Sequence, residues 1–376
     1  MSTGMHKKSA FASAAKVFAA LCLSGAAGLA LAQEAKVVNI YNWSDYIAED
    51  TIKNFEKETG IKVRYDTFDN NEIVHAKLVA GKSGYDIVVP SSNWAKLQLD
   101  GGLLRKLDKS QLPNLKNLDP AIQRQIASMD PGNDYMVNWL WGYTTVGINT
   151  AKVKAALGSE PMPANVWELV FNPKYVSKLK SCGVSVLDSA SEVLPAALHY
   201  LGKDPFSKNS SDYQEASAAL KAIRPYITLF SSSGYINEMA GGSICLSLGW
   251  SGDINIARQR AIDGKTGQDI EALIPASGGI LFFDMMAIPA DAPNAANAHA
   301  FINYILRPEV HAAITNKVFY ANPNKESQKF VKQEVASNPT VFVDAAKMAT
   351  MKAPKAMTND IRRLVTRIYT SFKTGI

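Results

Sequence analysis

The sequence predicts an α/β protein made of two α/β lobes. Strand-like and helix-like segments alternate over residues 36–90, and a similar alternation returns later in the chain. Such alternation is typical of a parallel sheet with crossover helices. A chain of 376 residues is long enough for two domains. Because no low-complexity linker separates the two regions, we expect several short crossings between the lobes.

Residues 36–90 contain the first strand–helix–strand series. Strands are indicated by β-branched or alternating apolar residues, and helices by apolar residues at helical spacing. The expected elements are a strand over 36–41, a helix over 50–59, a strand over 61–66, a helix around 73–78 and a strand over 85–89. Gly60 and Gly81 end the two helices, and Pro90 ends the last strand.

The second region repeats the pattern with longer intervals. Its expected elements are strands over 142–149, 184–187, 244–248 and 280–288, with helices over 193–201 and 295–306. Ligands of such sheets bind beyond the carboxyl ends of the strands. The residues that follow each strand are therefore the first candidates for a functional site.

The N-terminus has the features of a cleaved export signal. Lys7 and Lys8 precede a short apolar run, and residues 30–32 read Ala-Leu-Ala, a small–x–small cleavage pattern. We expect cleavage near Ala32 and an exported, soluble mature protein. Loss of residues 1–32 removes three lysines and no acid, so the formal charge falls from +6 to +3. No basic cluster or nucleic-acid motif is present, and we expect no nucleic-acid partner.

Aromatic, hydroxyl and acidic residues recur at the predicted strand ends. They are Trp43, Ser44, Asp45 and Tyr46 after the first strand, Ser91 after 85–89, Glu192 after 184–187, Trp250 and Asp253 after 244–248, and Phe282 and Asp284 after Leu281. A cleft built from these residues would be acidic, with aromatic walls.

Such a cleft fits an alkyl diamine. A buried ammonium group needs a carboxylate partner, because an unpaired buried charge is very costly. Aromatic faces attract a cation by about 0.5–2 kcal/mol each, and each buried methylene contributes roughly 0.8 kcal/mol. Two separated acidic ends would measure the length of the ligand.

Each of these residues also has a structural interpretation. Trp43 and Trp250 could belong to the core, and Asp45 could cap the helix that begins near residues 48–50. Glu192 could occupy the first turn of its helix. Asp253 and Asp284 could serve in turns or ion pairs.

Enzyme interpretations have less support. Outside the signal, the histidines fall within helical patterns, and no zinc-protease or nucleophile-elbow motif is present. We therefore expect no catalytic residue, no metal and no cofactor. Paired carboxylates such as Asp253 and Asp284 could cleave a glycoside, so a secreted hydrolase remains an alternative.

Two cysteines remain after the signal, Cys182 and Cys245. An even pair in an exported protein predicts a disulfide. Two buried free thiols are the alternative. Their spacing does not match a redox or zinc motif.

The chain resembles the polyamine-binding proteins of bacterial ABC importers over nearly all of its mature length. The blocks that carry the resemblance are IYNWSDYIAEDTIKNFEKETGIKV (40–63), YDIVVPSS (85–92), LKSCGVSVLD (179–188), INEMAGGSICLSLGWSGD (236–253), FFDMMAIPADA (282–292) and VFYANPN (318–324). The resemblance implies a type II periplasmic-binding-protein fold with a ligand cleft between two lobes. Lobe 1 is expected over 33–137 and about 262–312, and lobe 2 over about 138–261 and 313–376.

The resemblance also implies a set of ligand-binding residues. It comprises Trp43, Ser44, Asp45, Tyr46, Ser91, Glu192, Trp250, Asp253, Phe282, Asp284 and Tyr320. In the family, the positions of Asp253 and Asp284 hold one ammonium, whereas the Ser44–Asp45 segment and Glu192 surround the other. Trp43, Trp250 and Phe282 match an aromatic box around the methylenes. The family's disulfide matches Cys182 and Cys245.

The implied function is capture of putrescine by lobe closure and delivery, as a monomer, to an inner-membrane ABC permease. Ser44, Asp45 and Phe282 match the putrescine pattern within the family. Asn93 and Trp94 depart from it, and Trp94 is expected to narrow or reshape the cleft near Ser91. A receptor that prefers spermidine, cadaverine or agmatine, or a polyamine sensor, is the alternative.

Overall fold

A single nine-stranded mixed sheet organises residues 35–376, the part of the chain that the computed structural model describes. The predicted signal and its cleavage near Ala32 lie outside these residues. The strands follow the order β2-β1-β3-β9-β4-β7-β5-β6, and β8 pairs with β4. They are β1 (Val37–Trp43), β2 (Lys62–Phe68), β3 (Ile87–Val88), β4 (Met136–Asn149), β5 (Val184–Val186), β6 (Leu229–Phe230), β7 (Leu246–Trp250), β8 (Ile270–Leu273) and β9 (Ile280–Ala287).

Helices cover both halves of this sheet. The helices are α2 (Glu49–Thr59), α3 (Asn71–Val79), α4 (Ser92–Asp100), α5 (Pro120–Ile126), α6 (Thr150–Leu157), α7 (Glu168–Phe171), α8 (Pro173–Leu179), α9 (Ala190–Tyr200), α10 (Ser210–Ile223), α11 (Tyr235–Gly241), α12 (Ser251–Asp263), α13 (Ala295–Ile305), α14 (Pro308–Val318), α15 (Gln333–Ala336), α16 (Ala345–Met348) and α17 (Asn359–Thr374). Within the described residues, no helix is sufficiently long and apolar to span a bilayer.

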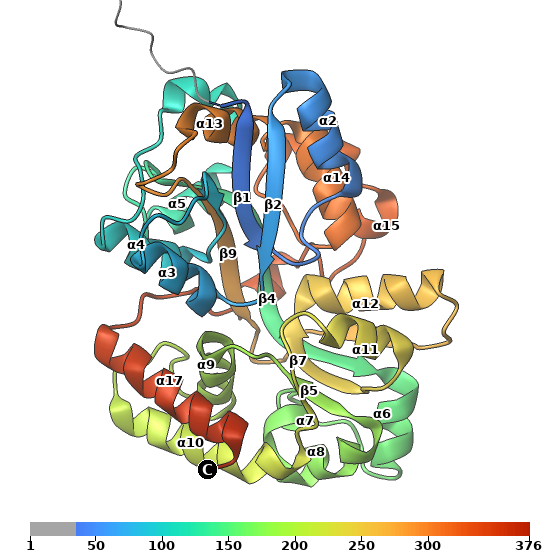
Figure 1. Ribbon diagram of the computed structural model, residues 1–376. Helices are drawn as coiled ribbons and strands as arrows, with labels where there is room; N and C mark the ends of the chain where they lie inside the picture. The colour runs from blue at the N-terminus through green and yellow to red at the C-terminus, as the bar shows by residue number, and fades with distance from the viewer. Residues whose placement is uncertain (1–34) are drawn as a thin grey trace, which may run out of the picture. The chain divides into compact units, whose positions relative to one another are not determined.

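The first half of the sheet contains the predicted strand–helix–strand series. β1 pairs in parallel with both β2 and β3, as the alternating pattern predicted. Gly60 ends α2 in the left-handed conformation, at φ 70°, where its N–H donates to the Glu56 carbonyl. Phe55 of α2 is fully buried against Phe301 and Tyr304 of α13. These elements occupy the upper part of Figure 1.

The second half has the same parallel arrangement. β5 pairs in parallel with β6 and β7, and α9, α10 and α17 lie together in the lower part of Figure 1. α9 begins after β5, as predicted, and its apolar face includes the fully buried Val193, Leu194 and Leu198. The carboxyl ends of these parallel strands and of β1–β3 position the candidate site.

Two long strands belong to both halves. The first part of β4, Met136–Thr144, pairs antiparallel with β9, and its last part, Thr144–Asn149, pairs with β7 and β8. The prediction placed only 142–149 in a strand, so β4 begins six residues earlier than expected. A register shift between Asn138 and Trp141 interrupts the β4–β9 ladder. The chain therefore passes between the halves within continuous strands.

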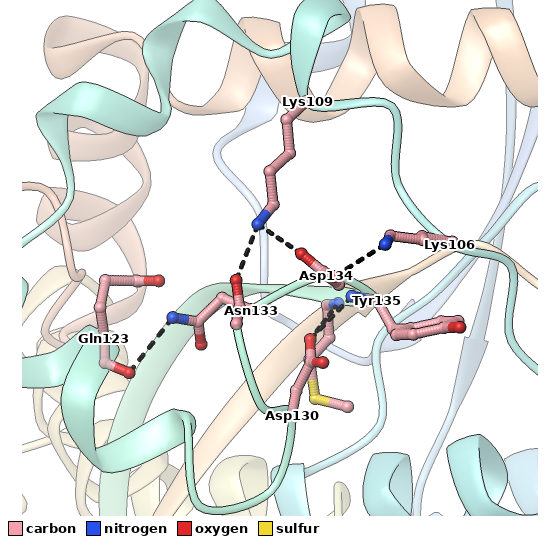
Figure 2. A network of polar contacts seen from close by, with 9 residues as sticks. Lys106, Lys109, Gln123, Asp130, Asn133, Asp134 and Tyr135 are labelled. Carbon is pink, nitrogen blue, oxygen red and sulfur yellow. Dashed lines mark hydrogen bonds and ion pairs between the residues drawn. The ribbon is translucent and has the colours of Figure 1, made fainter.

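A polar network fixes the start of β4 (Figure 2). One carboxylate oxygen of the buried Asp130 accepts the backbone N–H groups of Tyr135 and Met136, at 2.7 and 3.0 Å. Asp134 pairs with Lys106 and Lys109 at 2.9 and 2.5 Å. The two bonds to Asp130 satisfy backbone N–H groups where the strand begins.

The elements after residue 313 are divided between the upper and the lower part of Figure 1. Lys317 of α14 forms an ion pair with Glu49 of α2, and Figure 1 shows α14 and α15 in the upper part of the view. α17 lies in the lower part, where it packs with α9 and α10, and Lys355 before it pairs with Asp204. The expected boundaries of the two lobes stay a prediction.

A disulfide joins Cys182 and Cys245, whose Cα atoms are 5.5 Å apart. It connects the segment before β5 to the segment before β7, across a separation of 63 residues. The predicted pairing is confirmed. Because the bond restricts the unfolded chain, it should stabilise the fold by roughly 4 kcal/mol in the chain-entropy model.

Reduction of this disulfide is expected to lower the melting temperature. For the protein beginning at residue 33, we expect a decrease of roughly 5–10 °C in a reducing thermal melt. The double variant Cys182→Ala/Cys245→Ala serves as the control, because its melting temperature should not respond to the reductant. A wild-type melting temperature that is equal with and without reductant, after thiol counting confirms reduction, would contradict the stabilising role.

Candidate functional site

A cavity lies where the carboxyl ends of the two sets of parallel strands meet. Residues at or after the ends of β1, β2 and β3 line it from one half, and residues at or after the ends of β5, β6 and β7 line it from the other. Its lining residues are Trp43, Ser44, Tyr46, Phe68, Asp69, Ser91, Glu192, Ser232, Ser233, Ile236, Trp250, Asp253, Phe282, Asp284 and Tyr320. This location agrees with the rule for ligands of open α/β sheets.

The structure brings ten of the eleven predicted site residues to this cavity. They are Trp43, Ser44, Tyr46, Ser91, Glu192, Trp250, Asp253, Phe282, Asp284 and Tyr320. Phe282 and Asp284 do not follow a strand end, because β9 continues to Ala287. They lie two residues apart within β9, and the two-residue period of a strand places them on one face.

Asp284 is buried at 3% exposure and receives two hydroxyl donors. Ser91 donates to one carboxylate oxygen at 2.7 Å, and Tyr46 donates to the other at 2.8 Å. The Ser91 hydroxyl also accepts from the Asn71 amide at 3.0 Å. Because that donor occupies the acceptor side of the hydroxyl, the Ser91 proton is directed toward Asp284.

Asp253 has a matching environment on the other half. It is 6% exposed, and the hydroxyls of Tyr320 and Tyr235 donate to its two carboxylate oxygens at 2.7 and 3.1 Å. The Tyr320 hydroxyl also accepts the backbone N–H of Asp253 at 3.1 Å. Both aspartates are thus held by hydroxyl groups, and no cationic side chain of residues 35–376 is bonded to either.

Burial dominates the electrostatics of the carboxylates. It raises the pKa of Asp253, Asp284 and Glu192 to about 7 each, although hydrogen bonds to each group oppose the shift. Thr144 of β4 donates to Glu192 at 2.5 Å. Three carboxyl groups with pKa values near 7 lie in one cavity. A cationic ligand would stabilise their charged form, because it supplies the opposite charge that burial removes.

Aromatic rings form the walls. Trp43 and Trp250, one from each half, meet edge to face with ring centroids 5.4 Å apart. The Trp43 indole N–H donates to the Val89 carbonyl at 2.8 Å, which fixes the plane of this ring. Phe282 and Tyr320 lie 6.0 Å apart, also edge to face. The core interpretation of Trp43 and Trp250 is incomplete, because both rings line the cavity as well as being buried.

Asp45 is the predicted site residue that lies elsewhere. It is exposed, has a positive φ of 54° and pairs with Arg260 of α12 at 2.5 Å. It also does not cap α2, whose N-cap is Ala48 without a side-chain bond. The local turn directs Asp45 away from its neighbours Ser44 and Tyr46, which do line the cavity.

Five lining residues were not predicted. They are Phe68, Asp69, Ser232, Ser233 and Ile236. Phe68 and Asp69 stand at the end of β2, where the strand-end rule would have found them if applied to the strand predicted over 61–66. The two serines follow β6, which has only two residues and gives no strand pattern in the sequence.

Trp94 does not lie in the cavity. Its ring contacts His75 of α3 at a centroid distance of 5.4 Å, and it lines a separate small pocket with Glu72 and Arg362. Trp94 was expected to narrow the cleft beside Ser91. Instead it lines this second pocket, whose other residues include members of α17.

The charge of the cavity lining is one-sided. Of the described residues that line it, four carry carboxyl groups (Asp69, Glu192, Asp253 and Asp284), and none is Lys, Arg or His. Within residues 35–376, no group of three or more His, Cys, Asp or Glu side chains is arranged to hold a metal ion. The cavity can therefore attract an organic cation, enclose its apolar part and accept its hydrogen bonds.

Comparisons with known proteins identify similar chains. A family model described as "Bacterial extracellular solute-binding protein" matches residues 50–343. The putrescine-binding periplasmic protein PotF of Escherichia coli is 47% identical over 346 residues, covering 92% of this chain and 93% of PotF. The putrescine-binding periplasmic protein SpuD of Pseudomonas aeruginosa is 45% identical over 361 residues, covering 96% and 98%. The crystal structure of the Tp0655 (TpPotD) lipoprotein of Treponema pallidum matches with a TM-score of 0.74 and 25% identity, covering 90% and 99%.

Proposed function

The chain belongs to the bacterial extracellular solute-binding proteins, and from that premise we propose that it captures putrescine in the periplasm and delivers it to an inner-membrane ABC permease. The similar structure confirms the predicted periplasmic-binding-protein fold. Membership of this family supports a binding protein over the glycoside hydrolase alternative. Two relatives, PotF and SpuD, are described as periplasmic putrescine binders.

One observation carries the proposal: the cavity combines four carboxyl groups with aromatic walls, and none of its described lining residues is cationic. An anion would be repelled there. A neutral sugar would leave the buried carboxylates without countercharge, which is costly. A dication with an apolar middle satisfies both the acidic groups and the rings.

The arrangement suggests how putrescine would lie. One ammonium would bind between Asp253 and Asp284, whose oxygens already receive directed hydroxyl donors. The other would lie near Glu192, Asp69 and Ser44, where the chain supplies further acceptors. The four methylenes between them would pack against Trp43 and Trp250 and contribute about 3 kcal/mol.

Lobe closure would enclose this ligand. Several contacts join segments that the sequence assigns to different lobes. Asp45 pairs with Arg260, and Glu72 of α3 accepts the Ser191 backbone N–H at the start of α9, at 3.2 Å. Only a ligand that binds the closed form better can shift the population toward it. Putrescine meets this condition because it would contact residues of both lobes, and we propose that the protein acts as a monomer.

The test is a calorimetric titration of protein that has been unfolded and refolded to remove bound ligand. Putrescine is compared with butylamine, which has the same four carbons and one charge, and with cadaverine, spermidine and agmatine. We expect butylamine to bind at least about 100-fold more weakly, because the second buried carboxylate pairing is lost. Equal affinity for butylamine and putrescine would contradict recognition at two ends. If spermidine, cadaverine or agmatine binds more tightly than putrescine, that polyamine is the preferred ligand and the proposal of putrescine is wrong.

A further inference from the structure

Tyr235 stands behind the cavity wall. It is the first residue of α11 and is fully buried, but it does not line the cavity. Its ring lies against Gly249 of β7, where an added Cβ would meet the ring at 2.7 Å. Any side chain at position 249 would therefore displace the tyrosine, and the glycine makes this close approach possible.

The hydroxyl of Tyr235 connects two residues of the cavity. It accepts the backbone N–H of Trp250 at 3.0 Å and donates to Asp253 at 3.1 Å. A phenol hydroxyl has one proton, and the Trp250 N–H occupies its acceptor side. The proton is therefore directed at Asp253, as the Tyr320 proton is on the other oxygen.

We propose that Tyr235 is a positioning residue that holds the Asp253 carboxylate and the Trp250 backbone in the arrangement that receives an ammonium group of the polyamine. This inference rests on the proposed function, and it concerns a residue that the ligand does not touch. The Tyr235 hydroxyl acts through Asp253 by stabilising the charged carboxylate, and through Trp250 by fixing the start of α12, whose N-cap is Trp250.

The charged and titratable groups around this pair define the expected pH response. Asp253 accepts hydrogen bonds from Tyr320 and Tyr235 and interacts electrostatically with Asp45 and Arg260. Tyr235 also interacts electrostatically with Glu192. Burial raises the pKa of Asp253 to about 7, and the hydrogen bonds from Tyr320 and Tyr235 oppose that rise. Removal of the Tyr235 hydroxyl should therefore raise the pKa of Asp253 further.

The experiment compares Tyr235→Phe with Tyr213→Phe as a matched control. Tyr213 of α10 is also fully buried, and its hydroxyl donates to the Ser207 carbonyl at 3.0 Å, away from the cavity. Putrescine is titrated by calorimetry from pH 6 to pH 9. For Tyr235→Phe we expect about a tenfold higher Kd at pH 7, with a smaller increase at pH 9, where Asp253 is ionised in both proteins. Tyr213→Phe should keep the wild-type profile even if it melts earlier.

The outcomes separate this inference from the proposed function. If wild-type protein fails to bind putrescine, the proposed function is wrong. If wild-type binds and Tyr235→Phe has an unchanged Kd, or a Kd raised equally at every pH, the positioning role is wrong. Should Tyr235→Phe not fold, Gly249→Ala displaces the same ring while keeping its hydroxyl. A Kd for putrescine that is higher than wild type at pH 7 and closer to wild type at pH 9 would support the inference. A Kd equal to wild type at every pH would overturn it.

Discussion

Asp284→Asn is expected to leave the protein folded and to raise the Kd for putrescine by roughly 100- to 5000-fold. Removal of one partner of a buried charge pair costs about 3–5 kcal/mol, and Asp284 would be such a partner for one ammonium. Folding should persist because the amide can take over the two hydrogen bonds. Its oxygen can accept from Ser91, and the Tyr46 hydroxyl, which bonds only Asp284 within the described chain, can turn to accept from the new amide.

The matched control for this variant is Asp291→Asn. Asp291 is exposed, belongs to the same predicted lobe and accepts from Ser83 outside the cavity, at 3.0 Å to the backbone N–H. Its Kd for putrescine should stay within about twofold of wild type. Calorimetry measures both constants, and a thermal melt confirms that each variant is folded. An unchanged Kd for Asp284→Asn would remove this residue from the ligand site.

The sequence predicts most of the site because the chemistry of open α/β sheets concentrates ligand groups after strands. Ser91, Glu192 and Asp253 follow strands that have clear apolar patterns, Trp250 is the last residue of such a strand, and all four reach the cavity. Tyr320 follows a helix, α14, so the strand-end rule alone could not find it. It was expected from the resemblance to a known family.

The remaining differences have local physical causes. The position of Asp45 depends on one left-handed backbone angle, which directs its carboxylate to Arg260. Sequence patterns do not specify such an angle for an aspartate. Ser232 and Ser233 follow a two-residue strand, which is too short to show a period. The sequence also underestimates the length of β4. The register shift between Asn138 and Trp141 interrupts the alternation of side chains by which a strand is predicted.

The three raised carboxyl pKa values predict that the stability of the empty protein and its affinity for putrescine change with pH in opposite directions. Asp253, Asp284 and Glu192 titrate near pH 7 in the folded protein but near pH 4 in an unfolded chain. Between these values the folded state binds more protons than the unfolded state. The contribution of these groups to the stability of the empty protein therefore falls as pH rises from about 4 to about 7.

Putrescine binding has the opposite pH dependence and strengthens as pH rises, because its two ammonium groups favour the ionised carboxylates. Both amines of the ligand stay protonated below about pH 9, as the lysine ammonium does. As pH decreases below 7, the ligand must displace protons, and we expect the Kd to be at least about tenfold higher at pH 5.5 than at pH 8. Calorimetry at both pH values, in buffers of different ionisation enthalpy, measures the affinity and the protons released.

The thermal melts supply an independent readout of the same linkage. Saturating putrescine should raise the melting temperature much more at pH 8 than at pH 5.5, because stabilisation grows with the ratio of ligand concentration to Kd. Asp284→Asn should weaken the pH dependence, since one titrating group is absent. A Kd that is constant from pH 5.5 to pH 8, without proton release, would show that the buried carboxylates do not meet the ligand's charge. The proposed recognition of a dication would then fail together with the predicted slope.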